Sequence, residues 1–164
     1  MYSDVFCKVY NEFGWNYYPE IFGEQLLTWL ERHNVKPANA MDLACGTGVL
    51  CELLHKAGIK AGIAVNPETD LSAIENYLDK VDMVLVMSVH PGYGGQSYIE
   101  DVNPKISELR KRMGDDFHIQ VDGGINLSNI AEVNKLGADV LVAGSAVFGG
   151  DIEKSVKGLL DAVK

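Results

Sequence analysis

Short apolar runs alternate with stretches of helical periodicity along most of this 164-residue chain. Apolar residues at helical spacing predict helices, and short apolar runs bounded by glycine or polar residues predict buried strands. The pattern predicts strands at 40–44, 60–65, 81–89, 119–121 and 140–143. It predicts helices at about 20–34, from 49 to a stop at Gly58, and at about 71–78, 104–113, 128–136 and 152–163.

The predicted strands are apolar on both sides, which is typical of a parallel sheet covered on both faces. Strand and helix alternate five times, so the fold class is α/β. The chain contains no linker and no low-complexity segment. We therefore expect a single domain, residues 1–164, built on a single five-stranded parallel sheet flanked by helices.

The length of the chain limits how such a sheet can close, because a complete eight-stranded barrel needs about 250 residues. Two arrangements stay open. The strands can keep their sequential order, as in half of a TIM barrel, or reorder into a doubly wound, Rossmann-like sheet. The expected architecture is thus a half-TIM-barrel and Rossmann-like hybrid.

The composition of the chain argues against several classes of binding partner. A formal net charge of −9 argues against general affinity for nucleic acid or an anionic membrane surface. No apolar run reaches the roughly 20 residues that span a bilayer, and the first residues lack the pattern of a signal peptide. Cys7, Cys45 and Cys51 lack the close pairing of a zinc site and are interpreted as reduced thiols. We expect a cytoplasmic protein that can still hold an anion locally through backbone amides.

A glycine loop follows the first predicted strand, in the run from Asp42 to Gly48. Gly46 and Gly48 allow a tight turn and close approach of a ligand, and the next helix begins with free N–H groups. With this loop, residues 1 to about 57 resemble the start of a class I S-adenosylmethionine-dependent methyltransferase. The resemblance implies a cofactor-binding set of Asp42, Ala44, Gly46 and Gly48. The alternative is that the loop is only a tight turn.

The next strand departs from the methyltransferase pattern. It ends in the run from Ala64 to Pro67, with no carboxylate where that family holds the ribose hydroxyls, although Glu68 and Asp70 follow closely. We therefore expect that no cofactor is bound. If the glycine loop does bind one, we expect it to be S-adenosylmethionine.

The remainder of the chain carries four motifs in order, at 60–67, 87–96, 121–125 and 143–148. On these motifs, residues 58–164 resemble the last four strand–helix units of a ribulose-phosphate 3-epimerase. Glycines after successive strands expose backbone amides, and residues 144–145 precede a short helix whose dipole favours an anion. The resemblance implies that a phosphate or sugar phosphate is held by Gly92, Gly94, Gly95, Gln96, Gly123, Gly124, Gly144 and Ser145. Tight turns alone are the alternative reading of each loop.

Asp122 lies at the C-terminal end of its strand, within the third of these motifs. The resemblance implies that it is both a metal ligand and one of two acid/base carboxylates. Its family partners, an opposing aspartate and two histidines, lie on early strands that this chain lacks. His118 begins a strand, at the end away from the catalytic loops, and His90 lies at the correct end in a position that varies in the family. We expect Asp122 to be a vestigial catalytic residue, a divalent metal to be absent, and epimerase activity to be negligible.

The two resemblances meet near residues 55–60, where both families have a helix that ends before a strand. The sequence is therefore interpreted as an engineered chimera without a complete active site, which retains weak phosphate or sugar-phosphate binding. An S-adenosylmethionine-binding module and a residual metal-dependent epimerase are the alternatives. Because most of the chain resembles a barrel, sequential strand order is favoured. The open sheet face then requires cover from the aromatic N-terminal segment or from a second copy in a homodimer.

Overall fold

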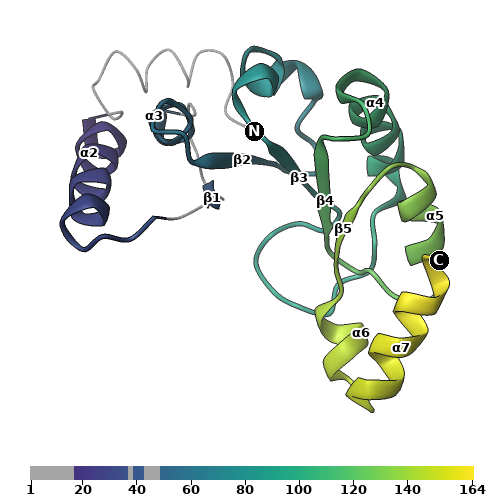
Figure 1. Ribbon diagram of the computed structural model, residues 1–164. Coiled ribbons are helices and arrows are strands. Elements are labelled where there is room, and N and C mark those ends of the chain that lie inside the picture. Colours follow the sequence, from purple (N-terminus) through teal and green to yellow (C-terminus); the bar gives the residue numbers. More distant parts are fainter. Residues whose placement is uncertain (1–16, 37–38, 43–48) are drawn as a thin grey trace. The chain divides into compact units, whose positions relative to one another are not determined.

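The computed structural model describes residues 17–36, 39–42 and 49–164, and its contacts divide the chain into two compact units (Figure 1). Unit 1 comprises residues 1–64 and 72–82, and unit 2 comprises residues 65–71 and 83–164. The division does not coincide with the predicted boundary near residue 57. A single domain over 1–164 stays a prediction.

Unit 1 contains a parallel strand pair and its neighbouring helices. β1 (Asn39–Asp42) pairs with β2 (Lys60–Val65), with Asn39 opposite Lys60. The helical segments are α2 (Tyr17–Arg32), α3 (Val49–Lys56) and the 3-10 segment η1 (Leu71–Lys80). β2 is largely buried, as expected for an apolar strand in a covered parallel sheet.

Unit 2 contains three parallel strands in sequence order. β3 (Met83–Met87) pairs with β4 (His118–Asp122), which pairs with β5 (Val140–Val142). The helical segments are η2 (Glu100–Val102), α4 (Asn103–Met113), α5 (Ile130–Lys135), α6 (Gly144–Phe148) and α7 (Ile152–Ala162). In Figure 1, α4, α5 and α7 lie along one face of these strands. The α/β class, the parallel pairing and the flanking helices are confirmed, and the order within unit 2 is sequential, not doubly wound. A single sheet of five strands stays a prediction.

The core of unit 2 lies between the strands and these helices. Val84 and Val86 of β3 stand in register with Ile119 and Val121 of β4, and all four side chains are fully buried. On the alternate positions of β4, Gln120 and Asp122 are only half-buried. The four buried side chains contribute strongly to stability, because burial of apolar area is the main favourable term, and Leu85 on the opposite face of β3 is buried as well.

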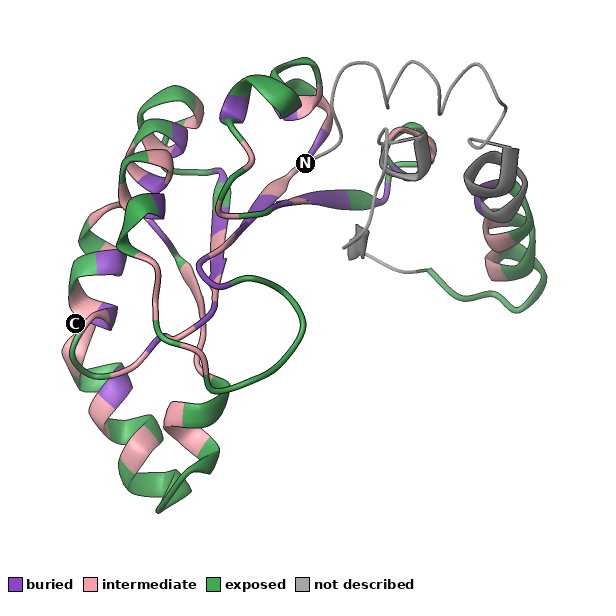
Figure 2. Ribbon diagram, turned by 180° about the vertical axis from the view of Figure 1, so that it is seen from behind, coloured by how far each residue is buried: buried purple, intermediate pink, exposed green. Residues whose placement is uncertain are grey.

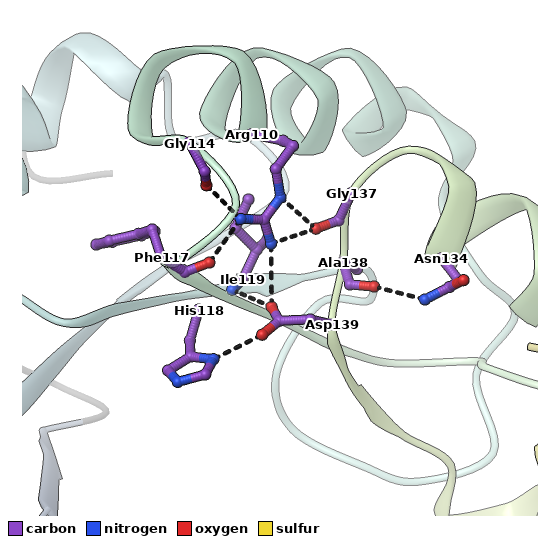
Figure 3. Close-up of polar contacts among 9 residues, drawn as sticks. All are labelled: Arg110, Gly114, Phe117, His118, Ile119, Asn134, Gly137, Ala138 and Asp139. Carbon is purple, nitrogen blue, oxygen red and sulfur yellow. Dashed lines mark hydrogen bonds and ion pairs between the residues drawn. The ribbon is translucent and has the colours of Figure 1, made fainter.

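A charged network fastens the amino ends of β4 and β5 to α4 (Figure 3). Asp139 accepts hydrogen bonds from the backbone N–H of Ile119 at 2.6 Å and from Nδ1 of His118 at 2.6 Å, and it pairs with Arg110 at 3.3 Å. The Arg110 guanidinium also donates to the carbonyls of Gly114, Phe117 and Gly137. These contacts hold the amino ends of the strands in place, and the predicted site lies at the opposite, carboxyl ends. His118 lies at the amino end of β4, as predicted.

Two predicted elements differ in extent or type. The strand expected at 81–89 is limited to Met83–Met87. The flanking residues still bond to neighbouring strands, since the N–H of Asp82 donates to Ala61 and that of Ser88 to Asp122. The helix expected at 71–78 is a 3-10 helix over Leu71–Lys80. Among the helices that the structure describes, none has the length and apolar character needed to cross a membrane.

Candidate functional site

The carboxyl ends of the three strands of unit 2 lie side by side. Met87 at the end of β3 is in register with Asp122 at the end of β4, which is in register with Val142 at the end of β5. The loops that follow these strands therefore start at one edge of the sheet. In parallel α/β sheets this edge is where ligands bind.

A pocket of about 500 Å³ is lined by residues from the segments that follow all three strands: the loops after β3 and β4 and helix α6 after β5. Gly95, Gln96, Gly124 and Ser145 line it, so the structure brings together predicted residues from each segment. The predicted residues Gly92, Gly94, Gly123 and Gly144 belong to the same segments but are not part of the lining. The rest of the lining consists of Ser97, Tyr98, Glu100, Ile125, Asn126, Ser128, Asn129, Glu132 and Ala146.

Two peptide groups after β4 are held in fixed orientations. The Ser88 hydroxyl donates to the carbonyl of Gly123 at 2.7 Å. The side-chain amides of Asn126 and Asn129 donate to the carbonyl of Gly124 at 2.9 and 3.0 Å. In a planar trans peptide the N–H lies opposite the C=O. These three side chains therefore also fix the directions of the N–H groups of Gly124 and Ile125, two residues that line the pocket.

Only glycine fits at position 124. Its φ is +65°, which L residues rarely adopt, and an added Cβ would overlap the backbone of Tyr98. The β3 loop thus lies directly against the β4 loop. This close approach lets the two loops share one pocket.

Gln96, a predicted phosphate-binding residue that lines the pocket, also makes contacts within its own loop. Its side-chain amide donates to the carbonyls of His90 and Tyr93, at 2.7 and 2.8 Å. These bonds close the exposed glycine-rich loop on itself. Gln96 therefore holds the loop in shape from within.

Carboxylates also line the pocket. Glu100 and Glu132 are exposed, and Tyr98 between them donates its hydroxyl to Asn103 at 2.6 Å. Burial, and then the nearby charges of Glu132 and Glu100, raise the pKa of Tyr98 to about 12. The lining contains no lysine or arginine, so an anion there depends on hydrogen bonds from backbone N–H, hydroxyl and amide groups.

Asp122 lies where the sequence placed it, at the carboxyl end of β4, and burial raises the pKa of its carboxyl. His90 pairs with Glu68 at 2.7 Å, and both side chains are more than half exposed. In the part of the chain that the structure describes, no group of three or more His, Cys, Asp or Glu side chains is placed to hold a metal ion. The described residues do not fit the metal that the epimerase resemblance implies.

The predicted cofactor set falls mostly outside the described residues. Asp42 is the last residue of β1, and Ala44, Gly46 and Gly48 are not described. The sequence reasoning missed Ser88, Asn126 and Asn129, which hold the glycine carbonyls. Two asparagines three residues apart, around the start of a predicted helix, were an available signal, because such side chains commonly bond nearby backbone groups.

Sequential parallel strands, helices on the outer face and a polar pocket at the carboxyl ends define part of an α/β-barrel type of protein. A mutant tryptophan synthase alpha-subunit from Pyrococcus furiosus is similar in fold, with a TM-score of 0.57 and 18% identity over 91% of this chain and 62% of that chain. The sequence model of the ribulose-phosphate 3 epimerase family matches residues 46–148. The chain belongs to this family.

Curated relatives agree with the family assignment. The chain is 54% identical over 110 residues to the chloroplastic ribulose-5-phosphate-3-epimerase of Arabidopsis thaliana. This match covers 65% of this chain and 39% of the relative. It is 46% identical over 101 residues to the ribulose-phosphate 3-epimerase of Serratia marcescens, with 60% and 48% covered. The chain thus spans less than half the length of these relatives. The predicted epimerase-like segment is confirmed, and the match begins at residue 46, before the expected boundary.

Proposed function

We propose that this chain binds phosphate or a sugar phosphate in the pocket at the carboxyl ends of β3, β4 and β5. The observation that carries the proposal is the convergence of Gly95 and Gly124, from the loops after β3 and β4, and Ser145, from the first turn of α6, on one pocket. Membership in the epimerase family supports the choice of ligand, because the relatives are named for a phosphorylated pentose. Backbone N–H groups held in fixed directions bind oxyanions without requiring a basic side chain.

The proposed function stops at binding. Epimerisation through a planar intermediate needs an acid/base group on each side of the reacting carbon. Asp122 supplies one carboxyl at this edge, and its raised pKa suits proton exchange. The imidazole of His90 pairs with the carboxylate of Glu68. We therefore expect Asp122 to be vestigial and ribulose 5-phosphate to be bound without measurable conversion.

The proposal also includes the interpretation that the chain is an engineered chimera whose front segment derives from a methyltransferase. Gly46 and Gly48 lie within the epimerase family match, which favours the tight-turn reading of this loop. S-adenosylmethionine binding is the second candidate function, and the same experiment tests it.

The test is thermal unfolding and amide NMR of the whole chain with ribulose 5-phosphate, inorganic phosphate, ribulose or S-adenosylmethionine. A ligand that binds the native state raises the melting temperature. We expect a rise with the two phosphate-containing ligands and none with ribulose. The NMR shifts should concentrate at Gly124, Ile125 and Ser145.

Matched variants separate the pocket from general charge. Ser145→Glu puts a carboxylate in the lining and should weaken phosphate binding about tenfold, whereas Glu132→Gln removes one and should strengthen it severalfold. Lys154→Gln changes the net charge by the same amount as Ser145→Glu, on the exposed surface of α7, and should leave binding unchanged. Equal weakening by Ser145→Glu and Lys154→Gln would refute a site in this pocket.

A further inference from the structure

The pocket at the carboxyl ends of the strands lies at an accessible part of unit 2. The loop after β3 is exposed along most of its length, whereas β3 itself is largely buried (Figure 2). Among the lining residues, Ser97, Glu132 and Ser145 are exposed as well. A ligand can therefore reach the pocket from solvent, and the groups that the lining presents decide which ligand binds.

Most side-chain donors of this lining are already bonded within the protein. The Gln96 amide donates to two carbonyls of its own loop. The Tyr98 hydroxyl donates to Asn103, and the Ser128 hydroxyl donates to Asn126 at 2.6 Å. These side chains shape the walls of the pocket, so the donors left for a ligand come mainly from the backbone.

The free backbone donors lie after β4. The N–H groups of Gly124 and Ile125 have no hydrogen-bond partner among the residues that the structure describes. Ile125 is only 2% exposed, and a buried N–H is costly unless water or a ligand accepts from it. The hydroxyl of Ser145 adds a further donor from α6. These groups require a ligand that is rich in acceptor oxygens.

Two carboxylates border the same donors. Neither Glu100 nor Glu132 has an ion pair or a hydrogen bond from its side chain to another described residue. Glu132 follows Asn129 by three residues, so the two share one side of α5. Asn129 donates to the carbonyl of Gly124 at 3.0 Å, in the peptide group whose N–H belongs to Ile125. The carboxylate of Glu132 thus lines the pocket on the side of α5 that holds this peptide group.

The charges of the two carboxylates act on one part of the pocket. After the larger effect of burial, Glu132 and Glu100 both raise the pKa of Tyr98, to about 12. These three are the titratable side chains of the lining, which contains no lysine or arginine. A fully ionised tetrahedral anion would therefore meet two like charges and no counter-charge, which opposes its binding.

A phosphate that keeps one proton resolves this conflict. A carboxylate can only accept hydrogen bonds, and a bond from an O–H group to a carboxylate is among the strong ones. The monoanion of a phosphate monoester has such an O–H group, because its second pKa is near 6. Its remaining oxygens can accept from the N–H groups of Gly124 and Ile125. A sulfate ester has the same tetrahedral shape but no proton to donate.

We infer that Glu132, together with Glu100, makes this pocket selective for a phosphate that carries a proton over oxyanions that carry none. The inference rests on the proposed phosphate binding and specifies which protonation state is bound. The amide donors bind the oxyanion, and the carboxylates select its form.

The test is isothermal titration calorimetry of the whole chain with methyl phosphate and methyl sulfate, with amide NMR to locate binding. At about pH 5.5 both ligands are largely monoanions of the same shape, and methyl phosphate differs by its proton. We expect methyl phosphate to bind at least about tenfold more tightly than methyl sulfate. Its binding should weaken as pH rises towards 8, because the ligand loses the proton and gains a second charge, whereas methyl sulfate should bind weakly throughout.

Matched variants assign the selectivity to the carboxylates. Glu132→Gln provides an N–H donor for methyl sulfate and removes a like charge, so the preference for methyl phosphate should fall to about twofold or less. Glu100→Gln should act in the same direction more weakly. Glu153→Gln makes the same change in net charge on the exposed surface of α7 and should keep the tenfold preference. Circular dichroism checks that each variant is folded.

The possible failures are distinguishable. Equal binding of the two ligands to the wild-type chain, with NMR shifts at Gly124 and Ile125, would overturn the selectivity and leave the proposed phosphate binding in place. A preference that persists in the Glu132→Gln variant would overturn the role of this carboxylate. Absence of any methyl phosphate binding would overturn both the inference and the proposed function.

Discussion

Asp139 gathers three elements at the amino ends of the strands. It precedes β5, accepts from the first residues of β4 and pairs with Arg110 on α4 (Figure 3). Burial alone would raise the pKa of this carboxyl. The hydrogen bond from His118, the backbone N–H of Ile119 and the charge of His118 outweigh burial, so the pKa lies below its ordinary value.

Replacement of Asp139 by Asn should lower the free energy of unfolding by about 1 kcal/mol at pH 7, a modest value because the site is partly exposed. A carboxyl whose folded pKa is depressed stabilises above its unfolded pKa, near 4, and loses this contribution as pH falls through the folded pKa. The difference between wild type and variant in urea unfolding should therefore shrink from pH 7 to pH 3.5. Asp115→Asn, at an exposed turn, is the control. A difference independent of pH would show that the charge of Asp139 is not the cause.

The sequence identified the residues that must be glycine better than those that fix the loops. Positions 123 and 124 stood out because they follow a strand, and their positive φ values show why glycine is needed there. The contribution of Ser88 could not be predicted, because it depends on which carbonyl the folded loop brings within reach. Asn126 and Asn129 gave a signal for bonds to nearby backbone groups, but the sequence does not show which carbonyl they bond. Gln96 was predicted to bind the ligand and lines the pocket, and the sequence did not reveal that its side chain also closes its own loop.

At the scale of elements, α7 begins at a well-defined cap. The Asp151 side chain accepts a hydrogen bond from the backbone N–H of Lys154 at 3.0 Å, which satisfies one of the free donors of the first turn. The helix was predicted over 152–163 and is observed over Ile152–Ala162.

Asp151→Ala should lower the free energy of unfolding by about 1 kcal/mol, because the cap is lost. Asp151→Asn should lose much less, since its side-chain oxygen can still accept the bond. Urea unfolding followed by circular dichroism distinguishes the two. Equal losses in both variants would assign the effect to charge near the helix terminus.

Element type followed from periodicity more closely than element length. Strands β4 and β5 agree with prediction within one residue at each end, because their apolar runs are bounded by polar residues and glycine. The run at 81–89 was predicted too long, since Val81, Ser88 and Val89 are buried like strand residues but belong to connections. Burial alone does not reveal where strand pairing ends.

At the scale of the whole molecule, the most completely buried side chains among the residues that the structure describes belong to unit 2. Among the residues below 2% exposure are Val84, Val86, Ile119 and Val121 in β3 and β4 and Ile106 and Leu109 in α4. The described part of α2, in unit 1, is largely exposed or half-buried after Gly23. Local stability follows the density of buried apolar contacts.

Hydrogen exchange read by mass spectrometry should reflect this difference. We expect amides of β3 and β4 to exchange at least about tenfold more slowly than those of residues 28–32 in α2. Exchange of both regions at one common rate would mean that they open together in a single cooperative step, which would support the prediction of one domain.

The pocket has one further property. All of its lining residues lie between positions 95 and 146, within unit 2. The side chains that orient its peptide groups, at 88, 126 and 129, lie within or just before the same stretch. The pocket is therefore encoded by one continuous block of sequence. Gene truncation, duplication or recombination outside residues 83–146 would therefore keep every lining residue together with the three strands that carry them.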